Sequence, residues 1–302
     1  LQYIFAGAIL YFIFNFIELR ELVEIFKSLK VINLIIIILL AIAIQYLHIT
    51  RWGFILQKVD YTISWKIIRS SYFIGASAGF ITPGQIGEFF ARKINLNKIS
   101  VLNVSLYTFI DKFYLITTTL FLGSISLLLF FPSFIPQDFN TIKIALIIIS
   151  FGFPFLLVFS KSIIEFLNEN NFIKIKILSK LFDSLRSFNL DKLEKIKLIS
   201  NTSIIHFLLF LQFYFAFNSF IEISLLKVIS GIALLLFLKS FIFFSGVGDL
   251  GFREGLAILI FSKFNIPAEI SVSASLIIFS TNLLIPAFIG LILLLSNRYK
   301  TE

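Results

Sequence analysis

Two glycine-containing clusters of ionisable residues interrupt apolar stretches of this chain. The first cluster, directly after Pro83, consists of Gly84, Gly87, Glu88 and Arg92. The second cluster consists of Asp249, Gly251, Arg253 and Glu254. A glycine turn that opens into a helix presents free backbone N–H groups to an anion, and an arginine side chain adds a bidentate donor for phosphate. The residue types and their spacing therefore predict sites for a phosphate-bearing ligand, with the carboxylates balancing the arginines or binding an amine.

Each cluster also has a purely structural interpretation. Glu88 and Arg92 stand four residues apart in the acid-first order that favours an ion pair on a helix, which suits a helix end at the membrane interface. The second cluster is compatible with a loop cap that contains a local pair between Arg253 and Glu254. Ionisable residues at membrane depth are functional candidates by default, and this favours the functional interpretation of both clusters.

Three further ionisable residues are secondary candidates, namely Asp111, Lys112 and Lys239. Asp111 and Lys112 either belong to the site or form a pair near the cytoplasmic end of a helix. Lys239 either extends its long side chain to the interface or neutralises Asp249 or Glu88.

The sequence predicts neither a cofactor nor a metal site. It contains no Cys and only two His, which are far apart and lack metal-ligand spacing. The stretch from Gly246 to Gly251 fits G-x-G-x-x-G, but that pattern predicts a dinucleotide site only inside a βαβ unit. No Ser-x-x-Lys, HExxH or Walker-type sequence is present, so no catalytic residues are assigned.

The composition is that of an integral membrane protein. Hydrophobic residues make up 58% of the 302 residues and charged residues 14%, whereas soluble domains carry about 25% charge. We expect an all-α, polytopic membrane protein with about six to eight transmembrane helices and two re-entrant or broken helical hairpins. The net charge of +9 favours contact between a basic loop and anionic lipid over nucleic-acid binding.

The apolar pattern predicts one integral membrane domain over residues 1–302. Its first half, 1–160, contains the hairpin 67–92, and its second half, 199–302, contains the broken segment 225–264. The basic segment 161–198 between them is expected to form a cytoplasmic amphipathic helix. A span is expected from Val31 to Thr50, followed by Arg51 and Trp52 at the headgroup level and a polar connection over 53–66.

Charge bias orients these segments. The basic segment between the halves belongs in the cytoplasm by the positive-inside rule. Basic residues flank the hairpin 67–92 on both sides, so the hairpin is expected to enter and leave the membrane on the cytoplasmic face. Both termini are then cytoplasmic, and a second hairpin entering from the opposite face would make an inverted repeat.

The chain resembles the lysylphosphatidylglycerol synthase transmembrane-region family, the flippase-like domain of bacterial multiple peptide resistance factors. Five motifs in order carry the likeness: Arg51-Trp52; Pro83, Gly84, Gly87, Glu88 and Arg92; Asp111-Lys112; Gly248, Asp249, Gly251, Arg253 and Glu254; and Pro286 to Leu291. The likeness covers nearly the whole chain. The sequence departs from the family pattern at Asp249, where a glycine is common, and at Lys112, where an arginine is common.

The resemblance implies a non-enzymatic cell-membrane protein that handles a phospholipid or lipid-linked headgroup, or translocates it between leaflets, without an aminoacyltransferase domain. The eight residues of the two clusters are expected to form the site for this headgroup. The alternative is an accessory protein or enzyme of glycolipid or polyprenyl-linked sugar metabolism. A homo-oligomer and a glycosyltransferase partner are both compatible with the sequence.

Overall fold

The computed structural model describes residues 29–134, 190–241, 249 and 251–298, together with positions 144, 147, 148 and 152. All regular elements in these ranges are helices, so the predicted all-α class is confirmed. The basic segment expected over 161–198 lies outside the described residues as far as position 189.

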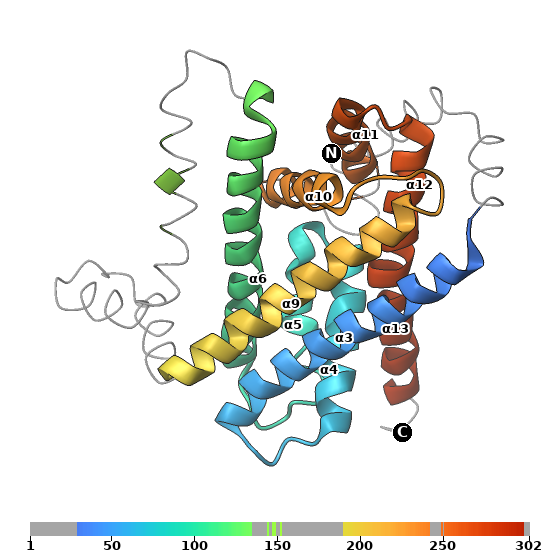
Figure 1. Ribbon diagram of the computed structural model, residues 1–302. Helices are drawn as coiled ribbons and strands as arrows, with labels where there is room; N and C mark the ends of the chain where they lie inside the picture. Colours follow the sequence, from blue (N-terminus) through green and yellow to red (C-terminus); the bar gives the residue numbers. More distant parts are fainter. Residues whose placement is uncertain are drawn as a thin grey trace.

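Along the chain, the first half consists of a long helix, a broken pair and a second long helix, and the first long helix passes in front of the broken pair in Figure 1. Its elements are α3 (Val31–Val59), α4 (Trp65–Ile81), the 3₁₀ turn η1 (Pro83–Gln85), α5 (Ile86–Ala91) and α6 (Val101–Phe130). The 3₁₀ turn η2 (Pro132–Phe134) follows α6.

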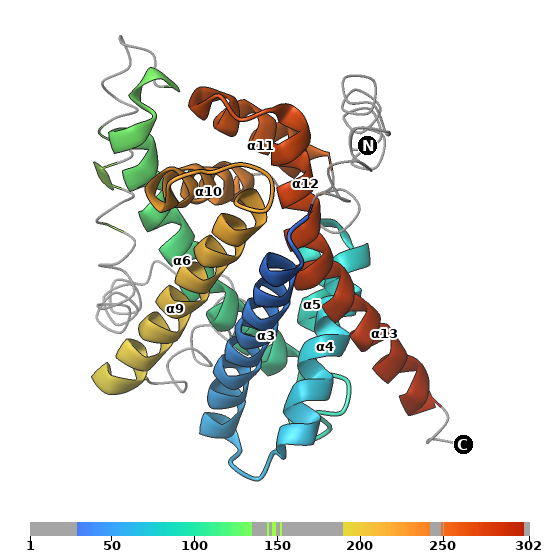
Figure 2. The same ribbon diagram turned by 45° about the vertical axis from the view of Figure 1, so that its right-hand side comes forward.

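The second half repeats this order. Its elements are α9 (Lys192–Phe217), α10 (Leu225–Ser240), α11 (Phe252–Phe261), η4 (Ser262–Phe264), α12 (Ala268–Phe279), the π-helical turn η5 (Ser280–Leu284) and α13 (Ile285–Arg298). Helices α12 and α13 form one long rod through the π turn (Figure 2). A long helix, a broken pair and a second long helix thus occur twice in the chain.

Four of these elements are long and apolar enough to cross a membrane, namely α3, α6, α9 and the combined stretch Ala268–Ser296. The first of them is longer than expected. Instead of ending near Thr50, α3 continues to Val59 and includes much of the polar connection placed at 53–66. Arg51 interrupts the apolar pattern after Thr50, but the helix continues because Trp52, Ile55 and Leu56 are fully buried against the protein.

The first broken pair folds back on itself. Gly84 and Gln85 both have positive φ, 60° and 58°, and these angles reverse the chain between α4 and α5. A Cβ added to Gly87 would lie 2.7 Å from the carbonyl oxygen of Ala78, so only glycine allows α5 to approach α4 this closely. The predicted interruption of the apolar stretch 67–92 is therefore a tight helical hairpin.

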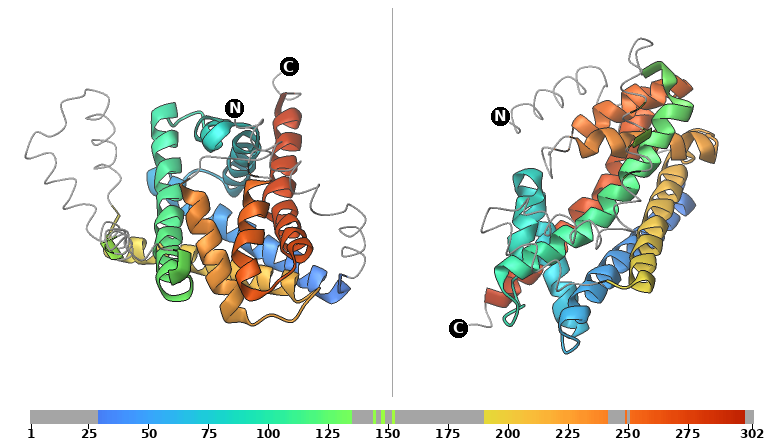
Figure 3. Two further views of the ribbon diagram at one scale, coloured as in Figure 1. Left: turned by 90° about the horizontal axis from the view of Figure 1, so that it is seen from above. Right: turned by 90° about the vertical axis from the view of Figure 1, so that its left-hand side faces the viewer.

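The two halves interlock through their broken pairs. Helix α13 packs against α4, α10 packs against α6, and α3 lies beside α9 (Figures 1 and 3). The connection into α4 is at the lower end of Figure 1, whereas α10 and α11 lie toward the upper end. Each half thus places its broken pair against the long helix of the other half.

Two glycines show how closely the halves correspond. A Cβ on Gly290 of α13 would collide with the carbonyl oxygen of Phe73, and one on Gly123 of α6 would lie 2.7 Å from the carbonyl oxygen of Ala233. Phe73 and Ala233 are both the ninth residue of their helices, counted from 65 to 73 in α4 and from 225 to 233 in α10. Matching close contacts at matching positions support the inverted repeat.

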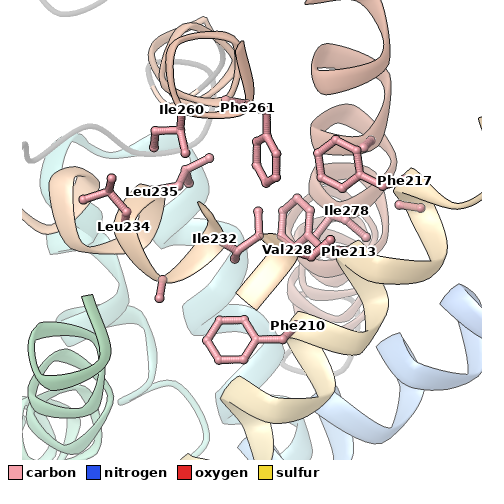
Figure 4. Close-up of a cluster of buried hydrophobic side chains, with 14 of the residues drawn as sticks. Phe210, Phe213, Phe217, Val228, Ile232, Leu234, Leu235, Ile260, Phe261 and Ile278 are labelled. Carbon is pink, nitrogen blue, oxygen red and sulfur yellow. The ribbon is translucent and has the colours of Figure 1, made fainter. Parts of the chain in front are cut away.

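The apolar core is divided in a similar way. One buried cluster joins α9, α10, α11 and α12 through residues such as Phe213, Ile232 and Phe261 (Figure 4). A second cluster joins α3, α4 and α6 around Trp52, Ile68 and Tyr107. The polar residues described below lie among these apolar groups.

Candidate functional site

Arg92 is the centre of the first cluster. Its Nη1 donates to Oδ2 of Asp111 at 2.9 Å, and its Nη2 donates to Oε1 of Glu88 at 2.5 Å. Arg92 is 1% exposed, Glu88 5% and Asp111 1%. The pair predicted between Glu88 and Arg92 is present, but it is buried and shared with α6 and does not lie at an exposed helix end.

Arg51 is the second buried arginine of the first cluster. It lies inside α3, where it is buried in the protein, and it donates from Nε to Oδ1 of Asp111 at 2.6 Å. Asp111 is therefore held between two buried arginines from different helices. The motif Arg51-Trp52 was visible in the sequence, but its place at the end of an apolar run indicated an interfacial anchor.

Lys112 forms the outer edge of the first cluster. Its Nζ lies 2.6 Å from Oε2 of Glu88 and 2.8 Å from Oε1 of Gln85. Its side chain is 24% exposed, in contrast to the buried groups behind it. Asp111 and Lys112 thus both join the cluster, but they bind different partners and do not pair with each other.

Aromatic rings enclose the Arg92 guanidinium. Its Cζ lies 4.3 Å from the ring centre of Trp52 and 5.5 Å from that of Tyr72. The backbone carbonyl of Arg92 accepts a hydrogen bond from Ser71, whose hydroxyl oxygen in turn accepts from the Trp52 indole. Cation–π contact and low polarity strengthen the electrostatic interactions inside this enclosure.

The first cluster carries a net positive charge. Arg51, Arg92 and Lys112 contribute three positive charges, and Glu88 and Asp111 contribute two negative charges, which leaves +1. Nη1 of Arg51 and Nε of Arg92 are buried and have no hydrogen-bond partner among the described residues. An excess positive charge with unused donors is suited to an anion.

Arg253 is the centre of the second cluster. Its Nε donates to the Ser275 hydroxyl at 2.8 Å, and its Nη2 is paired with the Glu254 carboxylate. Its Nη1 lies 3.6 Å from Oδ2 of Asp249, four residues earlier in the chain. The ring of Phe279 covers the guanidinium with its centre 4.6 Å from Cζ.

The start of α11 is capped by the protein itself. Gly251 has φ 86° and donates its N–H to Oε2 of Glu254 at 2.7 Å. Gly87 likewise donates its N–H to the Thr82 hydroxyl at 2.8 Å. The free backbone donors expected at these glycines are therefore already used, and the arginine and lysine side chains are the remaining candidates for binding an anion.

Lys239 joins the second cluster. Its Nζ lies 2.7 Å from Oδ2 of Asp249, which decides between the alternatives left open by the sequence. Its side chain is 23% exposed, close to the value for Lys112. Lys239 and Arg253 balance Asp249 and Glu254, so this cluster is neutral, and Oδ1 of Asp249 is buried without a partner among the described residues.

The two clusters have the same arrangement of charged residues. In each, a carboxylate and an arginine four residues apart are buried, and a partly exposed lysine closes the edge. The two lysines come from helices that do not correspond between the halves. Lys239 is the fifteenth residue of α10, counted from 225. The fifteenth residue of α4, counted from 65, is Gly79. Gly79 lies against Glu88, and Lys112 from α6 supplies the positive charge there.

Each described ion pair of the clusters stays within its own half of the chain. Between the halves, the ring of Phe80 at the end of α4 lies 6.0 Å from that of Phe279, which covers Arg253. Aromatic side chains thus connect the surroundings of the two clusters.

Other polar residues have structural partners. His206 bonds to Thr119 and to the carbonyl of Thr202, and Gln212 bonds to the carbonyl of Ile37. Among the described residues no group of His, Asp and Glu has an arrangement that would hold a metal ion.

Comparison with known proteins gives one match. A family model described as the lysylphosphatidylglycerol synthase TM region matches residues 1–290. No curated protein and no solved structure matches the chain.

Proposed function

The chain belongs to the lysylphosphatidylglycerol synthase transmembrane-region family, and we propose that it moves a phospholipid or lipid-linked headgroup between the leaflets of the cell membrane. The matched family model is that of the transmembrane region, and the proposed role needs no aminoacyltransferase activity. The protein is a multi-pass membrane protein, and we place both its termini in the cytoplasm.

The observation that carries this proposal is the paired arrangement of the clusters. A charged group at the centre of a bilayer costs about 2.5–3.5 kcal/mol even by the most lenient scale, so a headgroup needs polar partners along its path. Each half of this chain buries an arginine and a carboxylate four residues apart, at a break in a helix pair. One cluster from each of the two interlocked halves could bind the headgroup as it enters the membrane from one leaflet and as it leaves toward the other.

The charges assign a role to each residue. Lys112 and Lys239 are the partly exposed cations, so they make the first contact with a headgroup phosphate. Arg92 and Arg253 then hold the phosphate, while Glu88 and Glu254 balance the arginines. Asp249 has an oxygen without a partner among the described residues, and it takes the amine of a zwitterionic headgroup. The acyl or prenyl chains stay in the lipid.

Leaflet exchange in liposomes tests this function. The protein is reconstituted with a fluorescent phospholipid, and the fraction protected from an external quencher is followed over time. We expect Lys112→Gln and Lys239→Gln to slow exchange about tenfold, equivalent to about 1.4 kcal/mol in the barrier.

Lys58→Gln is the matched control. Lys58 pairs with Glu194 at 2.6 Å and its side chain is 25% exposed, yet it belongs to neither cluster. Its variant should exchange lipid at the rate of the unmodified protein. Equal rates for all three lysine variants, at matched insertion, would remove the clusters from the mechanism.

A further inference from the structure

The break between α12 and α13 leaves a backbone carbonyl in need of a donor. Across the π turn the N–H of Ile285 bonds to the carbonyl of Ser280, and Pro286, the next residue, has no N–H to offer the carbonyls before it, which include that of Asn282. That carbonyl accepts instead from Nε2 of Gln45, on α3, at 3.2 Å. A side chain from another helix therefore completes the backbone at the break.

Gln45 is engaged on its other side as well. Its Oε1 accepts a hydrogen bond from the Tyr72 hydroxyl at 2.9 Å, and Tyr72 is buried on α4. The Tyr72 ring is one of the two rings that enclose the Arg92 guanidinium. One amide thus connects the proline break to the aromatic enclosure of the first cluster.

Two more contacts connect the break to its surroundings. The Asn282 side chain donates from Nδ2 to Oε1 of Gln212 on α9 at 2.6 Å. Gly290, four residues beyond Pro286, lies directly against the carbonyl of Phe73, the neighbour of Tyr72. The break is thus joined to Tyr72 through Gln45, and α13 approaches the backbone beside Tyr72 through Gly290.

We propose that Gln45 is a positioning residue, which couples the break between α12 and α13 to the Arg92 side chain through Tyr72. Helix α12 contacts α11 of the second half, and α13 contacts α4 of the first half. The break is therefore the joint between the two halves, and π turns and prolines are common sites of helix bending. The use of this coupling in lipid movement rests on the proposed function, but the coupling itself is measurable without it.

Trp52 provides the readout. The chain has two tryptophans, and Trp65→Phe leaves Trp52 alone, with its ring 4.3 Å from the Arg92 guanidinium. Indole fluorescence responds to a nearby charge. In this background we expect Gln45→Leu to shift the emission maximum of Trp52 and to lower the midpoint of thermal unfolding.

Gln57→Leu is the matched control. Gln57 lies on the same helix and donates its side-chain amide to the carbonyl of Ile63, also at 3.2 Å, but in the described part of the chain it makes no hydrogen bond with Tyr72. Its loss should leave the Trp52 emission unchanged. If Gln45→Leu and Gln57→Leu give the same emission spectrum as the parent protein, the proposal is overturned.

A second substitution distinguishes the coupling of the break to Tyr72 from a role of Gln45 that is limited to its hydrogen bond with the Asn282 carbonyl. Pro286→Ala returns a backbone N–H to the break, four residues after the Asn282 carbonyl and able to reach it. Added to Gln45→Leu, it should restore the unfolding midpoint but not the Trp52 emission, because the Tyr72 hydroxyl still lacks its partner. Recovery of both signals would show that Gln45 only satisfies the carbonyl, and would overturn the proposal.

Leaflet exchange by the same variants tests the connection to function. We expect Gln45→Leu to slow exchange roughly tenfold, with no change in the lipid concentration that gives half-maximal rate. If the Trp52 emission responds as expected while the parent protein exchanges no lipid, the coupling stands and the proposed function fails.

Discussion

Asp111 lies between Arg51 and Arg92, and both arginines donate to its carboxylate from different helices, at 2.6 and 2.9 Å. All three side chains are at most 2% exposed. Burial to this degree makes it costly for either arginine to lose this carboxylate, because a buried charge without a partner is strongly destabilising. Asp111 is thus the counter-ion on which the association of α3, α5 and α6 depends.

Replacing Asp111 with Asn should destabilise the protein by about 3–5 kcal/mol, because it leaves buried positive charge uncompensated. Glu194→Gln, which breaks the partly exposed pair with Lys58, should cost no more than about 1 kcal/mol. Unfolding of both variants in the same detergent, followed by circular dichroism, measures the difference. Equal losses would mean that the buried cluster contributes no more than a surface pair.

The contacts of Gly290 and Gly123 predict a matched pair of defects. Ala at either position would force a methyl group against a backbone carbonyl of the opposite half, and overpacking of this kind costs about 1–3 kcal/mol. Ser296→Ala on the exposed side of α13 should change stability by less than about 0.5 kcal/mol. Thermal unfolding of the three variants tests the close approach of the halves, and a neutral Gly290→Ala would contradict it.

Replacing Gln85 should raise the stability of the protein and lower its activity. Its φ of 58° is unfavourable for a residue with a side chain, and its Oε1 accepts from Lys112. Gln85→Gly should raise stability by about 0.5–1 kcal/mol by relieving that strain, while lipid exchange falls because Lys112 loses a partner. Exchange at the rate of the unmodified protein would show that the side chain has no part in the site.

The fold class and both broken segments could be predicted from the sequence, because apolar length and charge position are local properties. The pairing of Glu88 with Arg92 was predicted for the same reason, since four residues is one helical turn. The length of α3 could not be predicted. Arg51 and Lys58 interrupt the apolar pattern of its last part, but Trp52, Ile55 and Leu56 between them are buried by tertiary contacts.

The composition of the site was only partly predictable. Arg51 and Asp111 are sixty residues apart, and their pairing depends on how α3 crosses α6. The separate partners of Asp111 and Lys112 follow from their directions on one helix, which a dipeptide in a sequence does not reveal. The N–H of Gly251 was expected to be free, but Glu254 three residues later caps it. Each of these differences depends on where side chains point in three dimensions, which the sequence alone does not reveal.

The central claim is that both clusters act in turn on one headgroup, and a double-substitution cycle on the leaflet-exchange rate tests it most directly. Rates are compared for Lys112→Gln, Lys239→Gln and the protein that carries both. If the two clusters act in consecutive steps, the double variant should be at most about twofold slower than the slower single variant. Effects that multiply, or double-variant exchange as fast as that of Lys58→Gln, would contradict the claim.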